Sequence, residues 1–82
     1  MVQMHISIRL YGTLGQYVAG YDHQKGISLT VKSGTRVEDL IDQLGIPAQG
    51  VGIVSVNGTL SKADDLLKGD SQVKIFQPLA GG

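Results

Sequence analysis

Apolar and polar residues alternate over residues 4–10, where the sequence reads MHISIRL. A period of two is typical of a strand with one buried face. The same alternation over residues 27–31 predicts a second strand, and residues 72–76 predict a last one. The connection between the first two strands, residues 11–26, is rich in glycine. We expect it to be a long loop with one weak turn around residues 14–18.

A helix is predicted to begin next to Thr35. Thr35 followed by Glu38 has the form of a capping box, in which each side chain accepts a hydrogen bond from a backbone N–H that the first helical turn leaves unpaired. Apolar residues then recur three and four positions apart and form one stripe: Val37, Leu40, Ile41 and Leu44. Gly45 is expected to end the helix, and Pro47 to keep it from resuming. Because the stripe must be buried, the helix needs a sheet to pack on.

A hairpin is predicted at Asn57-Gly58, since this dipeptide is the strongest two-residue signal for a hairpin turn. A short strand would end at Val56, and a return strand would follow over residues 59–61. The next residues, 63–70, are mostly polar. We expect them to form a connection anchored by one buried leucine, Leu66 or Leu67.

The order strand, strand, helix, strand, short strand, strand predicts an α+β domain with the β-grasp, or ubiquitin-like, fold. A mixed sheet of four to five strands would have one main helix across one face. The first and last strands both have clean apolar faces, so we expect them to lie side by side and parallel at the centre. The expected core consists of Ile6, Ile8, Leu29, Val31, Leu40, Ile41, Leu44, Val54, Val56, Val73 and Ile75. Residues 1–82 would form a single domain, with a mobile tail over about residues 77–82.

Composition and charge argue against several classes of function. Seven Lys and Arg balance seven Asp and Glu, so no overall field would attract nucleic acid. The chain has no cysteine, which excludes disulfides and thiolate metal sites. No long apolar run predicts a membrane segment or a leader, so we expect a cytoplasmic protein that binds neither membranes nor nucleic acid.

Few side chains suggest catalysis. His5 and His23 have no cysteine or carboxylate cluster near them in sequence, and the paired carboxylates at residues 38–39 and 64–65 are explained by a helix start and a solvated turn. The glycines of residues 11–26 lack the lysine and hydroxyl of a phosphate-binding loop. We expect a protein that is not an enzyme and binds no cofactor or metal of its own.

Two glycines, Gly81 and Gly82, end the sequence. Glycine is costly to order and has no side chain to bury, so the pair adds almost nothing to stability. Two interpretations remain: a frayed terminus, or a narrow peptide that enters the site of a partner.

The sequence resembles the bacterial sulfur carriers typified by the small subunit of molybdopterin synthase and the thiazole-biosynthesis sulfur carrier, which are ubiquitin-like. Four segments support the resemblance, in the order of the family: ISIRLYGTLGQY, SGTRVEDLIDQLGI, VSVNGTL and LLKGDSQVKIFQPLAGG. The long connection after Leu10 favours the molybdenum branch. The tail departs from that branch, which often has a second proline where this sequence has only Pro78.

The resemblance implies a role for the Gly82 carboxylate. A ubiquitin-activating-like enzyme would adenylate it with ATP, and it would become a thiocarboxylate that donates sulfur in molybdopterin biosynthesis or, as the second choice, in thiamine thiazole biosynthesis. Gly81 and Gly82 would keep the peptide narrow enough to enter the partner. ATP would be used by the partner, and the large subunit of molybdopterin synthase would be a second partner. The alternative is a ubiquitin-like protein modifier, which joins its carboxylate to a lysine amine, or a non-catalytic interaction module.

The alternation of the strands also predicts a surface for partners. If Val73 and Ile75 face the helix, Phe76 faces away from it, and Ile53 faces away when Val54 points inward. Apolar side chains exposed together often mark a protein interface. The candidate partner-binding residues are Ile53, Leu60, Phe76, Pro78 and Leu79. The alternative for Phe76 is a place in the core beneath the tail.

Overall fold

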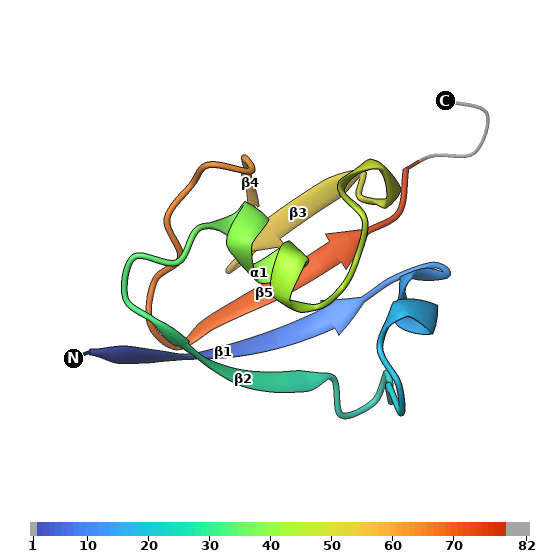
Figure 1. Ribbon diagram of the computed structural model, residues 1–82, viewed down its shortest axis with the longest axis horizontal. Helices are drawn as coiled ribbons and strands as arrows, with labels where there is room; N and C mark the ends of the chain where they lie inside the picture. The colour runs from blue at the N-terminus through green and yellow to red at the C-terminus, as the bar shows by residue number, and fades with distance from the viewer. Residues whose placement is uncertain (1, 79–82) are drawn as a thin grey trace.

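The computed structural model describes residues 2–78 as five strands, one α-helix and two 3-10 helices (Figure 1). In chain order these are β1 (Gln3–Leu10), η1 (Leu14–Tyr17), β2 (Ile27–Lys32), α1 (Val37–Gln43), η2 (Ala48–Gly50), β3 (Ile53–Val56), β4 (Thr59–Ser61) and β5 (Ser71–Phe76). The predicted β-grasp is confirmed. Of the expected tail, residues 79–82 lie outside the described residues.

The strands form one mixed sheet in the order β2-β1-β5-β3-β4. β1 and β5 are parallel neighbours, with Ile8 opposite Val73, and the other pairs are antiparallel. The prediction that the first and last strands lie side by side at the centre is therefore confirmed. Helix α1 covers one face of the sheet (Figure 1), and we call the other face the open face.

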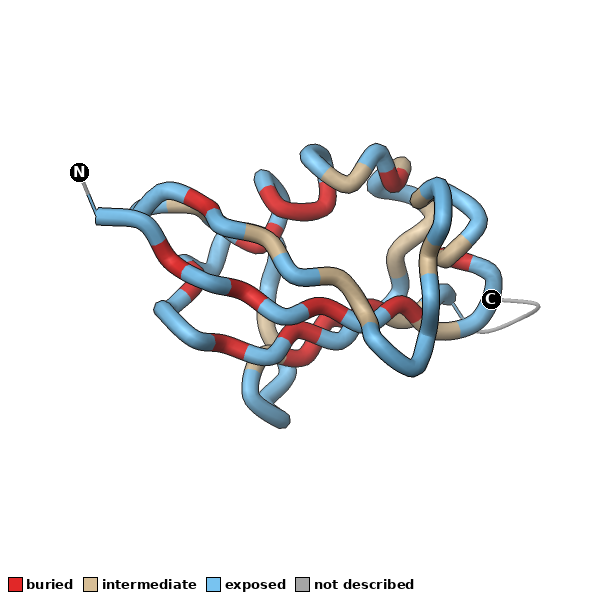
Figure 2. Tube along the Cα trace, turned by 90° about the horizontal axis from the view of Figure 1, so that it is seen from below, coloured by how far each residue is buried: buried red, intermediate tan, exposed pale blue. Residues whose placement is uncertain are grey.

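The core lies between α1 and the sheet. Buried and exposed positions alternate along β1 and β5, as the period of two predicts (Figure 2). The buried apolar residues are Met4, Ile6, Ile8, Leu10, Leu14, Val31, Val37, Leu40, Ile41, Ile46, Val54, Leu67, Val73 and Ile75. Three expected core residues, Leu29, Leu44 and Val56, are half-buried and pack against this cluster. Leu14 and Ile46 belong to connections where no periodic pattern marks a buried residue.

The start of α1 differs from the prediction. The residue before the helix is Arg36, whose backbone N–H donates to Asp39 Oδ2 at 2.9 Å. The Thr35 hydroxyl instead donates to the carbonyl oxygen of Lys32 at 2.7 Å. The predicted capping pair, Thr35 with Glu38, is therefore wrong.

The connection between β4 and β5 explains the difference. The N–H of Val37 donates to the carbonyl oxygen of Asp65 at 3.0 Å, and the N–H of Glu38 donates to that of Ala63 at 2.9 Å. Two of the N–H groups that the first turn leaves unpaired thus find backbone partners far away in sequence, and a side-chain cap from Thr35 is not needed. The anchor of this connection is Leu67, which is buried, whereas Leu66 is exposed.

Two turns behave as predicted. Asn57 and Gly58 both have positive φ, 53° and 84°, as a tight two-residue hairpin turn requires. Gly45, with φ 78°, follows the end of α1.

Among residues 2–78, no helix is long and apolar enough to cross a membrane.

The observed helix start can be tested with two neighbouring carboxylates. Both Glu38 and Asp39 are exposed in the first turn of α1, so both have a similar favourable interaction with the helix dipole. Asp39→Ala should lower the free energy of unfolding by about 1 kcal/mol more than Glu38→Ala, because only Asp39 accepts the Arg36 N–H. Urea unfolding of the two variants measures the difference, and equal losses would contradict the observed cap.

Candidate functional site

Three apolar side chains and a proline meet on the open face, at the end of β5. Phe76 is the cross-strand partner of Ile53 in β3, so both side chains point to the same face. Phe76 is half-buried, and Ile53 is 49% exposed. Together with Tyr11 and Pro78 they line one shallow pocket. We call Tyr11, Ile53, Phe76 and Pro78 the apolar end of the open face.

Phe76 is not part of the core. Its ring stacks on that of Tyr11, with the ring centroids 4.6 Å apart and the planes inclined by 17°. The prediction from strand alternation, that Phe76 faces away from the helix, agrees with this position. Tyr11 covers one side of the Phe76 ring, a contact that strand alternation does not predict.

Tyr11 is held in turn by the loop that follows it. Its ring forms a T-shaped pair with that of His23, with centroids 5.0 Å apart and planes at 83°. The Tyr21 hydroxyl accepts the N–H of Leu10 at 2.7 Å and lies 3.1 Å from the Leu10 carbonyl oxygen, to which it donates. Residues 11–26 therefore fold back on the end of β1 and fix the place of Tyr11 beside Phe76.

Gln77 joins the end of β5 to the same loop. Its Oε1 accepts the backbone N–H of Thr13 at 2.7 Å and the Thr13 hydroxyl at 2.8 Å. Gly12, with φ +70°, leaves room for this side chain, since a Cβ at residue 12 would collide with the Gln77 side chain. We call Gln77 and Pro78, the first two residues of the predicted tail, the tail root.

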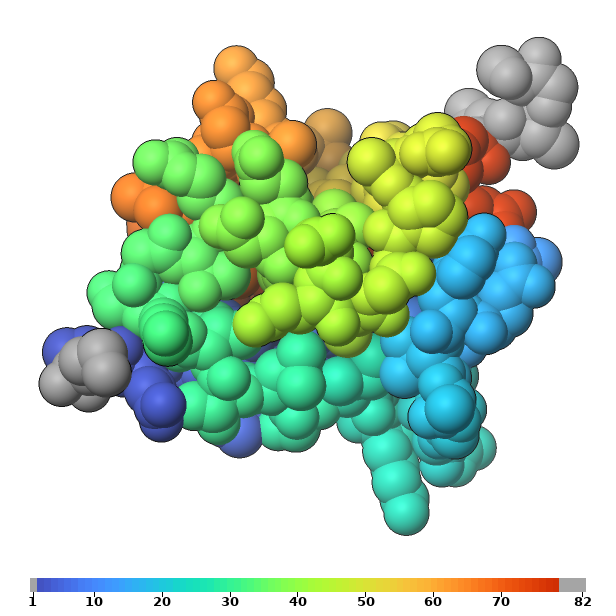
Figure 3. Space-filling view, viewed as in Figure 1, coloured from blue at the N-terminus to red at the C-terminus, as the bar shows by residue number. Residues whose placement is uncertain are grey.

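Gly52 lies against the other side of the tail root. Its N–H donates to the Phe76 carbonyl oxygen at 2.7 Å. A Cβ at residue 52 would lie 2.8 Å from the Gln77 carbonyl oxygen and 2.8 Å from Pro78 Cα. Two loops therefore hold the tail root between them, and Figure 3 shows the end of the described chain, in red, between the yellow segment near residue 50 and the blue loop after β1.

The structure brings some of the predicted partner-binding residues together and leaves others apart. Ile53, Phe76 and Pro78 line the same pocket. Leu60 is 70% exposed on the edge strand β4, where it pairs with Ser55 of β3. Ser55 lies two residues after Ile53 along β3. Leu79, Gly81 and Gly82 lie outside the described residues. Within residues 2–78, no three His, Asp or Glu side chains gather in a group that could hold a metal ion.

The close approach at Gly52 leads to a stability prediction. Gly52→Ala should destabilise the domain by about 1–3 kcal/mol, since the new methyl group displaces the backbone of the tail root. Gly50→Ala is the matched control, because a Cβ at residue 50 would make ordinary contact, 3.5 Å from Pro47 Cγ. Urea unfolding compares the two variants, and the Gln77 amide resonance should shift only in Gly52→Ala. Equal effects at both glycines would contradict the close approach.

Comparisons with known proteins agree with the fold. The chain is similar to Haloferax volcanii small archaeal modifier protein 1, with 19% identity, a TM-score of 0.71, and 93% of this chain and 99% of that one covered. It is also similar to the putative molybdopterin converting factor, subunit 1, from Pyrococcus furiosus. The identity is 22% and the TM-score 0.71, and 93% of this chain and 99% of that one are covered. A third similar structure is the complex of subunits 1 and 2 of the molybdopterin-converting factor from Helicobacter pylori. The identity is 19% and the TM-score 0.55, and 96% of this chain and 100% of the matched chain are covered.

No curated protein matches the sequence. The model of one family, described as Mut7-C ubiquitin, matches residues 3–78, nearly the whole chain. This match and the three solved structures confirm the predicted ubiquitin-like resemblance. The chain therefore belongs to the Mut7-C ubiquitin family of ubiquitin-like domains.

Proposed function

We propose that the chain is a sulfur carrier, with the carboxylate of Gly82 as the group that accepts and donates sulfur. The observation that supports this best is the position of the tail root. Gln77 and Pro78 leave β5 beside the apolar end of the open face. A partner that covers Tyr11, Ile53 and Phe76 thus lies next to the point where the tail begins.

The length of the tail sets the distance over which it can act. Residues 79–82 follow Pro78, and four extended residues reach at most about 14 Å. For a chain that ends at Gly82, the reactive centre of the partner would have to lie within about 14 Å of the tail root. Docking on the adjoining apolar end, with Gly81 and Gly82 as a thin peptide that enters the partner, satisfies this limit.

The chemistry starts from an unreactive carboxylate. In the proposed route, a carboxylate oxygen of Gly82 attacks the α-phosphorus of ATP on the partner, which forms an acyl adenylate and releases pyrophosphate. Sulfide then attacks the acyl carbon and releases AMP, which leaves a thiocarboxylate. This chain is the substrate of these steps and not an enzyme, and it needs no cofactor of its own, because the partner binds ATP.

The pathway we propose for the sulfur is molybdopterin biosynthesis, and thiamine thiazole biosynthesis is the second choice. The similar proteins from Pyrococcus furiosus and Helicobacter pylori are named as subunits of a molybdopterin converting factor, and the second occurs with its subunit 2. By analogy, the partners would be a ubiquitin-activating-like adenylating enzyme and the synthase large subunit. At 19–22% identity these neighbours establish the shared fold, and the pathway remains our proposal.

A second candidate is a ubiquitin-like protein modifier. The similarity to a protein named small archaeal modifier protein 1 favours it. The two candidates share adenylation and differ in what attacks the acyl carbon: sulfide in the carrier, and a lysine amine in the modifier. A linkage between Gly82 and lysine in cellular protein would identify the modifier.

Intact-mass spectrometry tests the carrier. The protein is incubated with the adenylating enzyme encoded in the same genome, ATP and sulfide, after its cellular form is shown to end at Gly82. We expect a mass gain equal to the exchange of one oxygen for one sulfur. A variant that lacks Gly82 should keep its Tm, since a chain end contributes little stability, and should show no gain. An unchanged mass in the wild-type protein would contradict the proposal.

The apolar end is tested by Phe76→Ala. The variant should bind the adenylating enzyme at least roughly tenfold more weakly, as expected for an aromatic anchor, and should remain folded because Phe76 lies outside the core. Leu66→Ala is the matched control, since Leu66 is 56% exposed in the connection that precedes β5. Titration calorimetry and circular dichroism measure binding and folding. Loss of the fold, or equal binding by both variants, would contradict the role of Phe76.

A further inference from the structure

Positive charge collects on the sheet, whereas negative charge lies elsewhere. The five strands contain Arg9, Lys32 and Lys74, which are all exposed, and no Asp or Glu occurs in any of them. Helix α1, on the other side of the sheet, has three carboxylates in its seven residues, VEDLIDQ. The charges within the strands are thus all positive and those within α1 all negative, while the other four cations and four carboxylates lie outside these elements.

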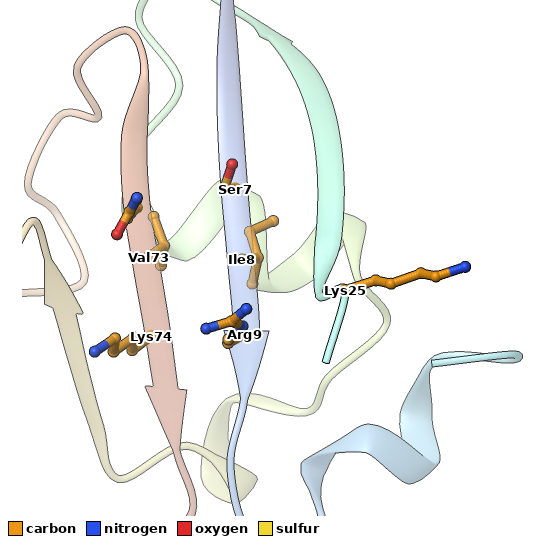
Figure 4. A pocket seen from close by; sticks show the side chains of 7 residues that line it. Ser7, Ile8, Arg9, Lys25, Val73 and Lys74 are labelled. Carbon is orange, nitrogen blue, oxygen red and sulfur yellow. The ribbon is translucent and has the colours of Figure 1, made fainter. Parts of the chain in front are cut away.

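Arg9 and Lys74 are direct neighbours on the open face. They are partners in the parallel pairing of β1 with β5, and Figure 4 shows the two side chains at the same level of adjacent strands. Like charges directly opposite one another destabilise a sheet. The Arg9 guanidinium also donates to the Gln24 carbonyl oxygen at 2.9 Å, which holds it near the sheet. This hydrogen bond gives Arg9 a role in the isolated domain, but the like charge of Lys74 opposite it is unfavourable there.

Polar side chains flank the two cations. Ser7 and Gln72 are partners in the same pairing, two residues before Arg9 and Lys74. With these cations they line a shallow hollow of about 200 Å³, and Lys25 extends away from it at the rim (Figure 4). We call Ser7, Arg9, Gln72 and Lys74 the basic end of the open face. Its hydroxyl, amide, guanidinium and ammonium groups are all donors suited to a carboxylate.

We propose that the basic end binds an acidic patch on the adenylating enzyme while the apolar end fills an apolar pocket next to that patch. This inference rests on the proposed function, which supplies the partner. The two ends adjoin along β5, where Lys74 and Phe76 are two residues apart on the same face. A carboxylate of the enzyme between Arg9 and Lys74 replaces their repulsion by two attractions. The like-charge pair thus stabilises the complex at the expense of the free domain.

The acidic partner is a protein and not a nucleic acid. A chain with no net charge has no long-range attraction for a phosphate backbone. The two aromatic rings of the open face, Tyr11 and Phe76, stack on each other, so one side of each ring is already covered and unable to stack on a base. A few cations beside an apolar patch instead match the mixed surface of a protein interface.

Charge reversal at one cation tests the inference. Lys74→Glu in the full chain should weaken binding to the adenylating enzyme by roughly tenfold or more at low salt, mostly through slower association. The same change should leave the Tm of the free protein equal or higher, because the new carboxylate would face Arg9 as an opposite charge. Lys68→Glu is the matched control, since Lys68 is exposed outside the strands. It should bind within about twofold of wild type.

The outcomes separate the possibilities. Equal weakening by both variants would overturn the basic end as the docking surface, and a lower Tm in Lys74→Glu would overturn the like-charge argument. Binding of single-stranded oligouridylate that is lost in Lys74→Glu would indicate nucleic acid instead.

If wild-type protein does not bind the enzyme, the proposed function loses its partner. The basic end is then tested alone, by an NMR titration with a hexaglutamate peptide. Shifts in the amides of Arg9, Gln72 and Lys74 would support it, and shifts elsewhere or none would overturn it.

Discussion

The parallel pairing of β1 with β5 determines where Tyr11, the tail root and the two cations of the basic end lie. Parallel strands end at the same edge of a sheet, so the loop after Leu10 and the tail root after Phe76 leave the sheet side by side. The N–H of Tyr11 donates to the Ile75 carbonyl oxygen at 2.9 Å, which extends the pairing one step beyond β1. From there Tyr11 reaches Phe76, and Thr13 reaches Gln77. The same register places Arg9 opposite Lys74.

Much of the fold could be predicted from local patterns. The alternation along β1 and β5 and the hairpin at Asn57-Gly58 each depend on residues close together in sequence, and the structure confirms them. The helix cap could not be predicted in this way. Its first N–H groups bond to carbonyl oxygens of the connection between β4 and β5, and nothing in the residues next to Thr35 reveals that connection. A tertiary contact replaced the local one.

Some features of the candidate site could likewise be predicted from local patterns, and others could not. The outward direction of Phe76 and Ile53 followed from strand alternation, since it needs no knowledge of neighbours. The bond between Thr13 and Gln77 joins residues 64 positions apart, and the stacking of Tyr11 on Phe76 depends on a loop with no regular pattern. Gly52 gave no signal either, because its importance comes from the backbone of Pro78 beside it. Contacts between loops and the tail root require the three-dimensional structure.

Docking on the open face must meet two opposite requirements in the proposed carrier: the partner must be held, and it must be released. Docking must hold the tail root within reach of a reactive centre, yet one short tail beside one surface can serve only one partner at a time. A carrier that is loaded by one protein and unloaded by another must therefore dissociate between the two. Exposed charge pairs are weakened by salt and contribute modest affinity, while charge complementarity speeds association. A small apolar contact joined to a few cations provides fast docking with ready release, which a larger buried interface would prevent.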